Sequence, residues 1–299
     1  MDEMVSSEAM VSAQIGPEWI EKQERYVQDN QVNTAVILAA GLGTRLRRED
    51  DLAQLTADQV SIARTGIKAL IPIDRPFLDY VLTSVADAGI EQVCLVIGPN
   101  HNVIRNYYEG LKCRRLQIKF AIQREPKGTA DAVASAADLV GDKPFLMLNS
   151  DNYYPLEVLR TLRNLPSNGV AGFDRRSLRP DGIISSEQLT QFCIIKTNAS
   201  DELGQIIEKP DVAVINALPD PVLVNMNCWR FGPSIFAASR AIRPSARGEF
   251  EIPDAVMHSI KYLGDRYRVL QSDGPVLDIS SRRDIETVTT QLADVKVAL

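Results

Sequence analysis

The sequence predicts an α/β protein with a mostly parallel mixed sheet flanked by helices, and three observations in its first third lead to this prediction. Residues 35–40 and 93–97 are apolar at every position, as expected for parallel strands that are buried on both faces. Between them, apolar side chains recur at helical spacing over residues 78–86. A strand, a helix and a second strand in this order form a βαβ unit, in which the two strands lie parallel in one sheet.

The same alternation continues along the chain. Helices are expected near residues 103–111 and 130–139, followed by apolar strands at residues 118–122 and 144–148 respectively. Beyond about residue 165 the apolar runs become shorter and more β-like: Phe192–Lys196, Ile206–Ile207, Val222–Val224 and Trp229–Phe231. The second half is therefore expected to add a smaller, β-rich lobe. After Asp278 we expect only a terminal helix and, because no hexapeptide repeat follows, no β-helical tail.

Composition and charge argue against several classes of protein. The 299 residues carry a net charge of −6, whereas a general nucleic-acid binder needs a basic face. The N-terminus, MDEMVSSEAM, has acidic residues where a signal peptide has Lys or Arg, and no apolar stretch approaches the length of a membrane span. We therefore expect a cytoplasmic protein that binds neither nucleic acid nor membranes. The four cysteines form no C-x-x-C pair and are expected to be reduced.

The first predicted strand ends in a glycine-containing turn, Gly41-Leu42-Gly43-Thr44-Arg45, which opens a helix. Glycines let backbone N–H groups approach an anion, and an arginine adds a rigid fork of donors for phosphate oxygens. A Walker-type pattern is absent, and Leu46 stands where a dinucleotide-binding loop has its third glycine. Taken alone, the two glycines are equally compatible with a plain tight turn.

Further sequence blocks give this loop a context. LAAGLGTRL is followed by GIKALIPIDRPFLDYVL, DAGI, QREPKGTADAV, LNSDN, IIEKP, NMNCWRF, RGEFEIPDAV and VLDISS. In this order the blocks resemble the sugar nucleotidyltransferase family over residues 34–285. This family includes glucose-1-phosphate thymidylyl-, uridylyl- and adenylyltransferases and mannose-1-phosphate guanylyltransferases. The resemblance implies a Rossmann-like nucleotidyltransferase fold with a sugar-binding lobe. It also implies a reaction in which a nucleoside triphosphate and a sugar 1-phosphate give an NDP-sugar and pyrophosphate.

The implied reaction needs cations more than a base. A phosphate monoester has its second pKa at about 6, so the attacking oxygen is already mostly ionised at neutral pH. Two like unit charges about 4 Å apart repel by about 4 kcal/mol at an effective dielectric of about 20, so positive charge must hold the substrates together. By the resemblance, Arg45 and Lys68 would hold the triphosphate, and Lys209 would lie between the α-phosphate and the sugar phosphate. His101 and His258 belong to no recognised motif and are interpreted as structural or surface residues.

Asp151 and Asp278 are the Mg²⁺ ligands that the resemblance implies. Each follows an apolar strand, and open α/β sheets bind ligands at the carboxyl ends of their strands. Mg²⁺ is commonly held by one or two carboxylates together with substrate phosphates and water. Each residue also has an ordinary structural interpretation, an Asx-turn for Asp151 and a helix N-cap for Asp278. In the same way, Arg45 alone is compatible with a helix-start residue and Lys209 with a turn residue.

The other site residues also come from the resemblance. Gln123 and Gly128 match the segment that recognises the nucleobase, and an amide offers both a donor and an acceptor to a base edge. The remaining nucleotide-binding positions are Ala39, Ala40, Gly41, Gly43, Thr44 and Thr129. On the sugar side, Glu208 would accept hydrogen bonds from hydroxyls, Asn225 lies in the block that contacts the sugar, and Cys193 stands where a glycine often does.

The expected domain organisation is simple. Residues 1–32 are predicted to be an extension that is partly helical or disordered, and residues 33–299 a single catalytic domain. Within this domain, residues 33–160 would mainly bind the nucleotide and residues 161–285 mainly the sugar phosphate. An insertion at residues 47–66 makes the spacing between the loop arginine and the following lysine about twice that of the family.

A few positions near the sugar depart from the family pattern. Asn227 and Trp229 replace a glycine and a tyrosine, Cys193 replaces a glycine, and Ser150 replaces the glycine that usually precedes the metal aspartate. The added bulk at Cys193 and Asn227 favours a phosphorylated substrate other than plain glucose 1-phosphate.

Two alternatives to this function stay open at the level of the sequence. One is a non-catalytic, nucleotide-binding regulatory protein on the same fold, although the retained cations and carboxylates argue against it. The other is a nucleotidyltransferase that acts on a phosphorylated cyclitol, alcohol or phosphonate. Because the family often forms dimers or tetramers, we also expect a homo-oligomer.

Overall fold

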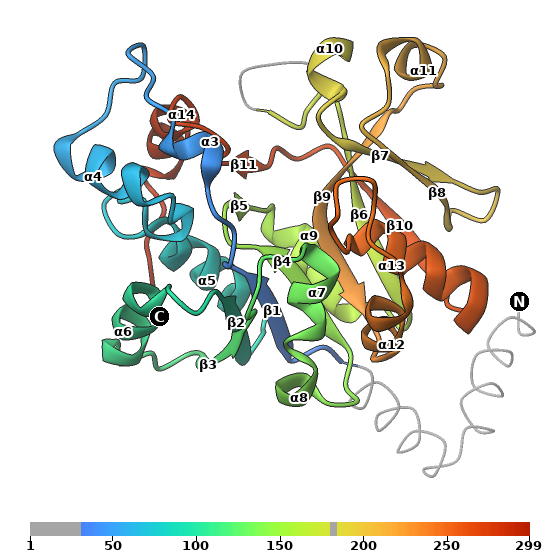
Figure 1. The fold of residues 1–299 in the computed structure, drawn as a ribbon, viewed down its shortest axis with the longest axis horizontal. Helices are drawn as coiled ribbons and strands as arrows, with labels where there is room; N and C mark the ends of the chain where they lie inside the picture. The colour runs from blue at the N-terminus through green and yellow to red at the C-terminus, as the bar shows by residue number, and fades with distance from the viewer. Residues whose placement is uncertain (1–30, 180–183) are drawn as a thin grey trace, which may run out of the picture.

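The computed structural model describes residues 31–179 and 184–299, and a nine-stranded sheet lies at its centre (Figure 1). The main path across the sheet runs in the order β10-β6-β9-β4-β1-β2-β3. The bounds of these strands are β1 Thr34–Leu38, β2 Gln92–Ile97, β3 Gln117–Ile122, β4 Phe145–Asn149, β6 Asn168–Asp174, β9 Leu223–Phe231 and β10 Tyr267–Ser272. The extension predicted for residues 1–32 lies, up to residue 30, outside the described residues.

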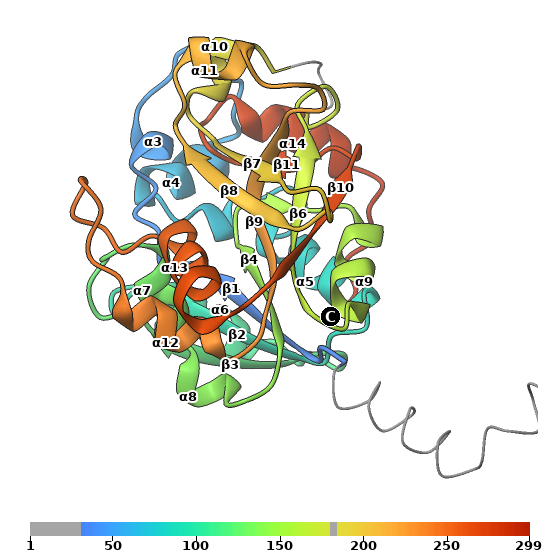
Figure 2. The ribbon, with the colours of Figure 1, turned by 90° about the vertical axis from the view of Figure 1, so that its right-hand side faces the viewer.

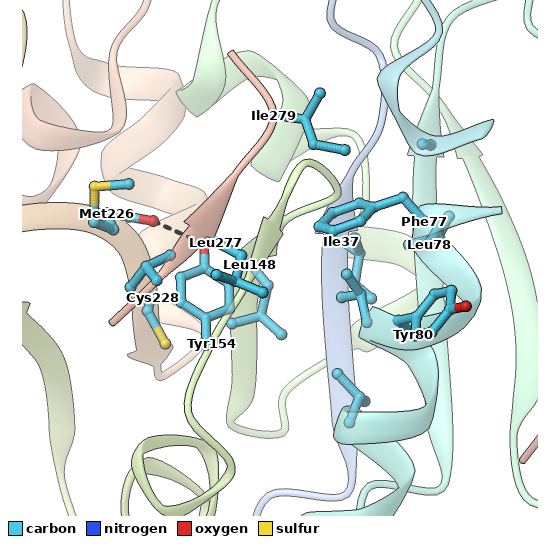
Figure 3. Close-up of a cluster of buried hydrophobic side chains, with 14 of the residues drawn as sticks. Ile37, Phe77, Leu78, Tyr80, Leu148, Tyr154, Met226, Cys228, Leu277 and Ile279 are labelled. Atoms are coloured by element: carbon cyan, nitrogen blue, oxygen red, sulfur yellow. Dashed lines mark hydrogen bonds between the residues drawn. The ribbon is translucent and has the colours of Figure 1, made fainter. Parts of the chain in front are cut away.

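The parallel half of the sheet is built on β1. This strand lies between β2 and β4 and runs parallel to both, and β3 adds a further parallel strand beside β2. Successive side chains of a strand point to opposite faces, so Val36 packs in one apolar cluster and Ile37 in the other. Figure 3 shows Ile37 beside Phe77 of α5 (Phe77–Asp87), the helix between β1 and β2. The predicted βαβ unit is confirmed.

The sheet becomes mixed at β9, which runs antiparallel to β4 and β6, while β10 runs parallel to β6. The predicted α/β class is confirmed, and the β-like runs predicted at Val222–Val224 and Trp229–Phe231 are both largely β structure, although they belong to one strand, β9. The polar residues Asn225 and Asn227 interrupt the apolar pattern without interrupting the strand.

Strand β6 was not predicted. Its Gly169 and Gly172 lower strand propensity and hide the pattern. They are needed for close packing, since a Cβ at Gly172 would lie 3.1 Å from the Cβ of Leu223 in β9.

Helices cover both faces of the sheet, as Figure 2 shows, with α7, α12 and α13 on one side and α5 and α9 on the other. The bounds of the helices other than α5 are α3 Thr44–Arg47, α4 Ala57–Thr65, α6 Asn102–Gly110, α7 Thr129–Ala134, α8 Ala137–Val140, α9 Leu156–Asn164, α10 Ser186–Leu189, α11 Val212–Asn216, α12 Ser234–Ala241, α13 Ile252–His258 and α14 Asp284–Leu292. The helix predicted at residues 130–139 is divided into α7 and α8. The regular hydrogen bonding is interrupted after Ser135, where the Ala136 N–H donates to the Val133 carbonyl (3.0 Å), three instead of four positions back.

The hairpin of β7 (Cys193–Thr197) and β8 (Leu203–Glu208) branches from β9 and lies with α10 and α11 away from β1–β3 (Figure 1). Strands β6, β9 and β10, in contrast, extend the main sheet. Among the described residues, the longest helix is α5 with 11 residues, and none combines the length and apolarity of a membrane span. The cysteines are all free thiols: Cys94, Cys113, Cys193 and Cys228.

Candidate functional site

The phosphate loop, residues 39–45, leads from β1 into α3 at the carboxyl edge of the parallel strands. Gly43 adopts a left-handed conformation (φ 58°) just before α3, and a Cβ there would lie 2.0 Å from the carbonyl oxygen of Gly66. Gly66 is itself left-handed (φ 79°) and ends α4, the helix of the insertion. The insertion therefore contains a short helix and packs its end directly on the phosphate loop.

His101 holds the beginning of the same loop. Its Nδ1 accepts a hydrogen bond from the Gly98 backbone (3.3 Å), and its ring lies near enough to the Ala39 carbonyl for that group to raise its pKa. Burial lowers the pKa of His101 below its ordinary value of 6.5, and the charge of Arg47 adds to this. The neutral ring is thus the form that links the end of β2 to the phosphate loop, in keeping with the structural role expected for this residue.

This arrangement predicts a pH-dependent contribution to stability. Since folding lowers the pKa of His101, its contribution is fully present above pH 6.5 and is lost as the pH falls through the lower folded-state value. Denaturant unfolding of His101→Gln and the unmodified chain should therefore differ more at pH 8 than at pH 5.5. An equal difference at both pH values would contradict the assignment of a neutral, linking imidazole.

Lys68 and Asp151 meet at the centre of the site. Lys68 begins the 3₁₀ turn Lys68–Leu70, and its Nζ lies 2.7 Å from Oδ2 of Asp151, with both side chains largely buried. Burial would lower the pKa of Lys68, but the charges of Asp151 and Asp278 outweigh this and raise it. The lysine is consequently a fixed positive charge, and the guanidinium of Arg45 is near enough to oppose that charge.

A small two-stranded sheet brings the second carboxylate to this point. Strand β5 (Asn152–Tyr153) pairs antiparallel with β11 (Leu277–Asp278), and the Ile279 N–H donates to the Asp151 carbonyl (3.0 Å). The Asp278 carboxylate accepts hydrogen bonds from Asn152 Nδ2 (3.0 Å) and Ser280 Oγ (2.6 Å). This pairing holds Asn152 and Asp278 side by side, although they are 126 positions apart in the chain.

The two carboxylates lie near each other, and a nearby cation would favour their ionised forms. Burial, together with the charge of Asp151, raises the pKa of Asp278 to about 6 despite the opposing effects of Lys68 and Ser280. Within the described residues no group of three or more His, Cys, Asp or Glu side chains is placed to hold a metal. A pair of carboxylates instead suits a cation that also takes ligands from a bound phosphate and water.

A cavity of about 280 Å³ joins several of the predicted nucleotide residues to Asp151. Its lining comprises Leu38, Ala40, Gly41, Leu42, Gln123, Pro126, Gly128, Thr129, Ala132, Asn149, Asp151, Asn227 and Glu249. A Cβ built at Gly41 meets nothing within 4 Å, so the backbone there is open. Ala39 is buried, and Thr44 and Arg45 are exposed on α3. A larger cavity of about 410 Å³ lies at β10, but it contains none of the predicted site residues.

The cavity wall opposite the loop is fixed by Gln123. Its Nε2 donates to the Gly128 carbonyl and to Asp131 Oδ2, both at 2.9 Å. Gly128 (φ 112°) lies so close to Phe250 that a Cβ would be 2.4 Å from the Phe250 carbonyl oxygen. Thr129 Oγ1 accepts the Ile252 N–H (2.9 Å), so this side chain ties α7 to the first residue of α13.

The predicted sugar-side residues lie on three adjacent strands. Cys193 of β7 pairs with Glu208 of β8 on one side and with Asn225 of β9 on the other, which places the three side chains together on one face. The Cys193 thiol donates to Glu208 Oε1 (3.6 Å), and burial together with the Glu208 charge raises the pKa of Cys193 to about 12. The group is therefore a neutral thiol rather than a nucleophilic thiolate.

Arg247 is a cation at this face that the sequence reasoning did not assign. Its Nη2 lies 3.5 Å from Glu208 Oε1 and 2.6 Å from Glu251 Oε2. Burial, with the neighbouring Glu251, raises the pKa of Glu208, whereas the hydrogen bond from Arg247 helps to lower that of Glu251. Arg247 is the first residue of the block RGEFEIPDAV, which forms part of the family resemblance, and this position was the sequence signal that could have indicated it.

Two non-glycine residues of the site adopt left-handed backbone conformations, Lys209 (φ 42°) and Asn227 (φ 57°). Asparagine tolerates this conformation best after glycine, so Asn227 keeps the backbone that the family glycine allows. Its N–H donates to Asn225 Oδ1 (2.9 Å), and its own Oδ1 accepts from Trp229 Nε1 (3.4 Å). Asn227 and Trp229, which both depart from the family pattern, are thus hydrogen-bonded to each other. The Lys209 side chain is exposed.

Comparison with known proteins identifies the family of this chain. The family model described as Nucleotidyl transferase matches residues 34–293, which is most of the chain. The chain belongs to the nucleotidyl transferase family. The predicted family and enzyme class are confirmed, and the chain is a nucleotidyltransferase.

Individual relatives differ in length. This nucleotidyltransferase is 29% identical to the UTP–glucose-1-phosphate uridylyltransferase AglF of Haloferax volcanii over 87% of its own chain and 96% of that protein. It is 30% identical to a glucose-1-phosphate thymidylyltransferase of Streptomyces griseus, of which it covers 56% with 74% of its own chain. The crystal structure of UDP-glucose pyrophosphorylase complexed with UDP-glucose matches with a TM-score of 0.69 at 20% identity, over 89% of this chain and 100% of that one, and shows the shared fold.

Proposed function

We propose that this nucleotidyltransferase joins a nucleoside triphosphate to a sugar 1-phosphate or a similar phosphate, giving an NDP-sugar and pyrophosphate. The observation that carries the proposal is the single cavity in which the phosphate loop, Gln123 and Asp151 meet, with Lys68 against Asp151. Asn227 lines this cavity and is two positions from Asn225 on the same strand, so the cavity reaches the strand that carries a predicted sugar-side residue. The names of the relatives support the same reaction.

In the proposed reaction, a phosphate oxygen of the sugar phosphate attacks the α-phosphorus, and the bond to the leaving pyrophosphate breaks. The main-chain N–H groups of the loop and the charge of Arg45 would bind the triphosphate, with Lys68 beside it. Lys209 would hold the two reacting phosphates together, and its strained backbone fixes the position from which its side chain extends. No residue needs to act as a base, because the nucleophile is already ionised.

Mg²⁺ would be held by Asp151 and Asp278, with the substrate phosphates completing its ligands. The pair fits such an ion because Asp278 is buried beside a second carboxylate, and only added positive charge makes two ionised groups stable there. When bound, the ion would neutralise phosphate charge. Asn152 and Ser280 would keep the Asp278 oxygens oriented in either state.

The base is proposed to be uracil or thymine. Both hydrogens of Gln123 Nε2 are engaged with Gly128 and Asp131, and Oε1 accepts no hydrogen bond within the part of the chain that is described. A carbonyl acceptor at this wall suits the N3–H of a pyrimidine dione. The test is a pyrophosphate-release screen that crosses UTP, dTTP, ATP, GTP and CTP with sugar 1-phosphates and phosphorylated cyclitols. Nucleotide binding without release from any pair would instead favour the regulatory alternative.

The sugar side leads to a prediction about specificity. Because Cys193 and Asn227 stand where the family has glycines, we expect plain glucose 1-phosphate not to be the best substrate of the panel. Cys193→Gly should raise kcat/KM for glucose 1-phosphate relative to the preferred substrate by about 10-fold, as for the removal of a small steric conflict. Cys113→Ala, away from the cavity, serves as the control and should leave the ratio unchanged. The idea is wrong if glucose 1-phosphate has the highest kcat/KM with the unmodified enzyme.

A further inference from the structure

Arg282 makes a long-range connection next to the proposed metal site. It follows Asp278 by four positions and is 6% exposed, yet its guanidinium reaches the other end of the chain. Its Nε donates to the Leu46 carbonyl (3.1 Å) and its Nη2 to the Arg47 carbonyl (3.3 Å). These are the last carbonyl groups of α3, the helix that carries Arg45.

The partners of Arg282 are backbone carbonyls at the end of a helix, which need hydrogen-bond donors from outside it. α3 has only four residues, so its final carbonyls have no partner within the helix. A positive side chain at a helix C-terminus satisfies such carbonyls and interacts favourably with the helix dipole. A buried guanidinium is costly unless its donors are used, and two of them are used here. Arg282 is thus a buried side chain with specific hydrogen bonds and not a solvated arginine on the surface.

The short segment between Asp278 and Arg282 is held in place by hydrogen bonds. The Asp284 carboxylate accepts hydrogen bonds from the backbones of Ser280 (3.1 Å) and Ser281 (2.6 Å), and Ser280 Oγ donates to Asp278. A movement of α3 relative to this segment would therefore break either the two bonds of Arg282 or the turn that orients the carboxylate.

We propose that Arg282 is a positioning residue that fixes the phosphate-loop helix, and with it Arg45, relative to Asp278. It touches no substrate; it acts through α3. The triphosphate is held by one of the connected parts and the proposed metal by the other, so their separation determines how the α-phosphate lies in the site. The kinetic part of this inference rests on the proposed function, whereas the structural part concerns the order of α3 alone.

The neighbouring residue provides a matched control. Arg283 is exposed and forms an ion pair with Asp50 in the insertion (2.5 Å), without bonding to α3. Arg282→Met and Arg283→Met therefore remove the same charge one position apart. Arg282→Lys is the conservative variant, since it keeps the charge but replaces the rigid fork, whose Nε and Nη2 each make one bond, with a single flexible nitrogen.

The first measurement is steady-state pyrophosphate release with the best substrate pair. Arg282→Met should lower kcat by about 100-fold, the effect expected of a displacement of about 1 Å, with a smaller change in the KM for the triphosphate. Arg282→Lys should recover part of kcat, and Arg283→Met should stay within about twofold of the unmodified enzyme. Wild-type kcat in Arg282→Met, or an equal loss in Arg283→Met, would overturn the proposal.

The second measurement does not depend on activity. Amide hydrogen exchange over residues 39–48, in full-length protein without ligand, should become faster in Arg282→Met and stay unchanged in Arg283→Met. If the unmodified chain released no pyrophosphate, the proposed function would fail, while unchanged exchange in Arg282→Met would still refute the positioning role. If Arg282→Met does not fold, Arg282→Lys gives the same comparison, with faster exchange at residues 39–48 as the supporting result.

Discussion

Asp151→Asn and Asp278→Asn will each lower the rate of pyrophosphate release by about 1,000-fold, which is at the upper end of the effect of removing one electrostatic contact to a transition state. Asparagine matches aspartate in size but lacks the negative charge that a divalent cation requires. The Asp278→Asn amide can still accept from Asn152 and can donate to the Ser280 hydroxyl, so the local hydrogen bonds persist. The rate is measured at saturating Mg²⁺ and substrates.

A stability measurement separates this loss from unfolding. Folding raises the pKa of Asp278 from 3.8 to about 6, so in the absence of metal its ionised form opposes folding increasingly as the pH rises through this range. Asp278→Asn removes that charge and should be at least as stable as the unmodified chain at pH 7.5. Asp87→Asn, which alters an exposed carboxylate paired with Arg115, should retain full activity. Wild-type turnover in either site variant would exclude the metal assignment.

Gly43→Ala will strongly impair both folding and activity. A left-handed conformation costs a non-glycine residue roughly 1–2 kcal/mol. The larger effect is steric, because the new Cβ would lie 2.0 Å from the Gly66 carbonyl oxygen and must push the end of α4 away from the phosphate loop. We expect a free energy of unfolding lowered by roughly 3 kcal/mol or more in total, at the high end for a point substitution. Activity should fall with it, since the loop N–H groups move.

Gly264→Ala isolates the steric part of this effect. Gly264 is also left-handed (φ 77°), but a Cβ there meets nothing within 4 Å. It therefore carries the backbone cost without the clash. Denaturant unfolding of both variants should show a clearly larger loss for Gly43→Ala. Equal losses would mean that the contact between the loop and the insertion does not constrain the protein.

The parallel half of the fold was predictable because its strands are buried on both faces. The runs at residues 35–40 and 93–97 are apolar throughout, and short, uniformly apolar runs are typical of such strands. β9 was harder to predict because the polar residues Asn225 and Asn227 interrupt its apolar pattern, and β6 because its glycines lower strand propensity. Polar residues in one strand and glycines in the other had weakened the local signal.

The site was predictable only where a motif lies in one stretch of chain. The loop, Gln123 and the two aspartates were placed by their sequence blocks, and the structure brings them together. The contacts of Arg247 and Arg282 were not predicted, since hydrogen bonds such as that from Arg282 to the Leu46 carbonyl join residues 236 positions apart. The left-handed conformation of Asn227 was also invisible, although it explains why asparagine replaces a glycine there.

The pairing of β5 with β11 also sets an order of events during synthesis. A nascent chain that has emerged through residue 272 already contains the phosphate loop, Gln123, Asp151 and every strand of the main sheet, but not the strand that bears Asp278. On the proposed assignments, such a chain would contain the nucleotide-binding residues before the second metal ligand has been translated. Catalytic competence would then arrive as one late step, when β11 docks on β5 and Arg282 reaches a helix that was translated more than 200 residues earlier.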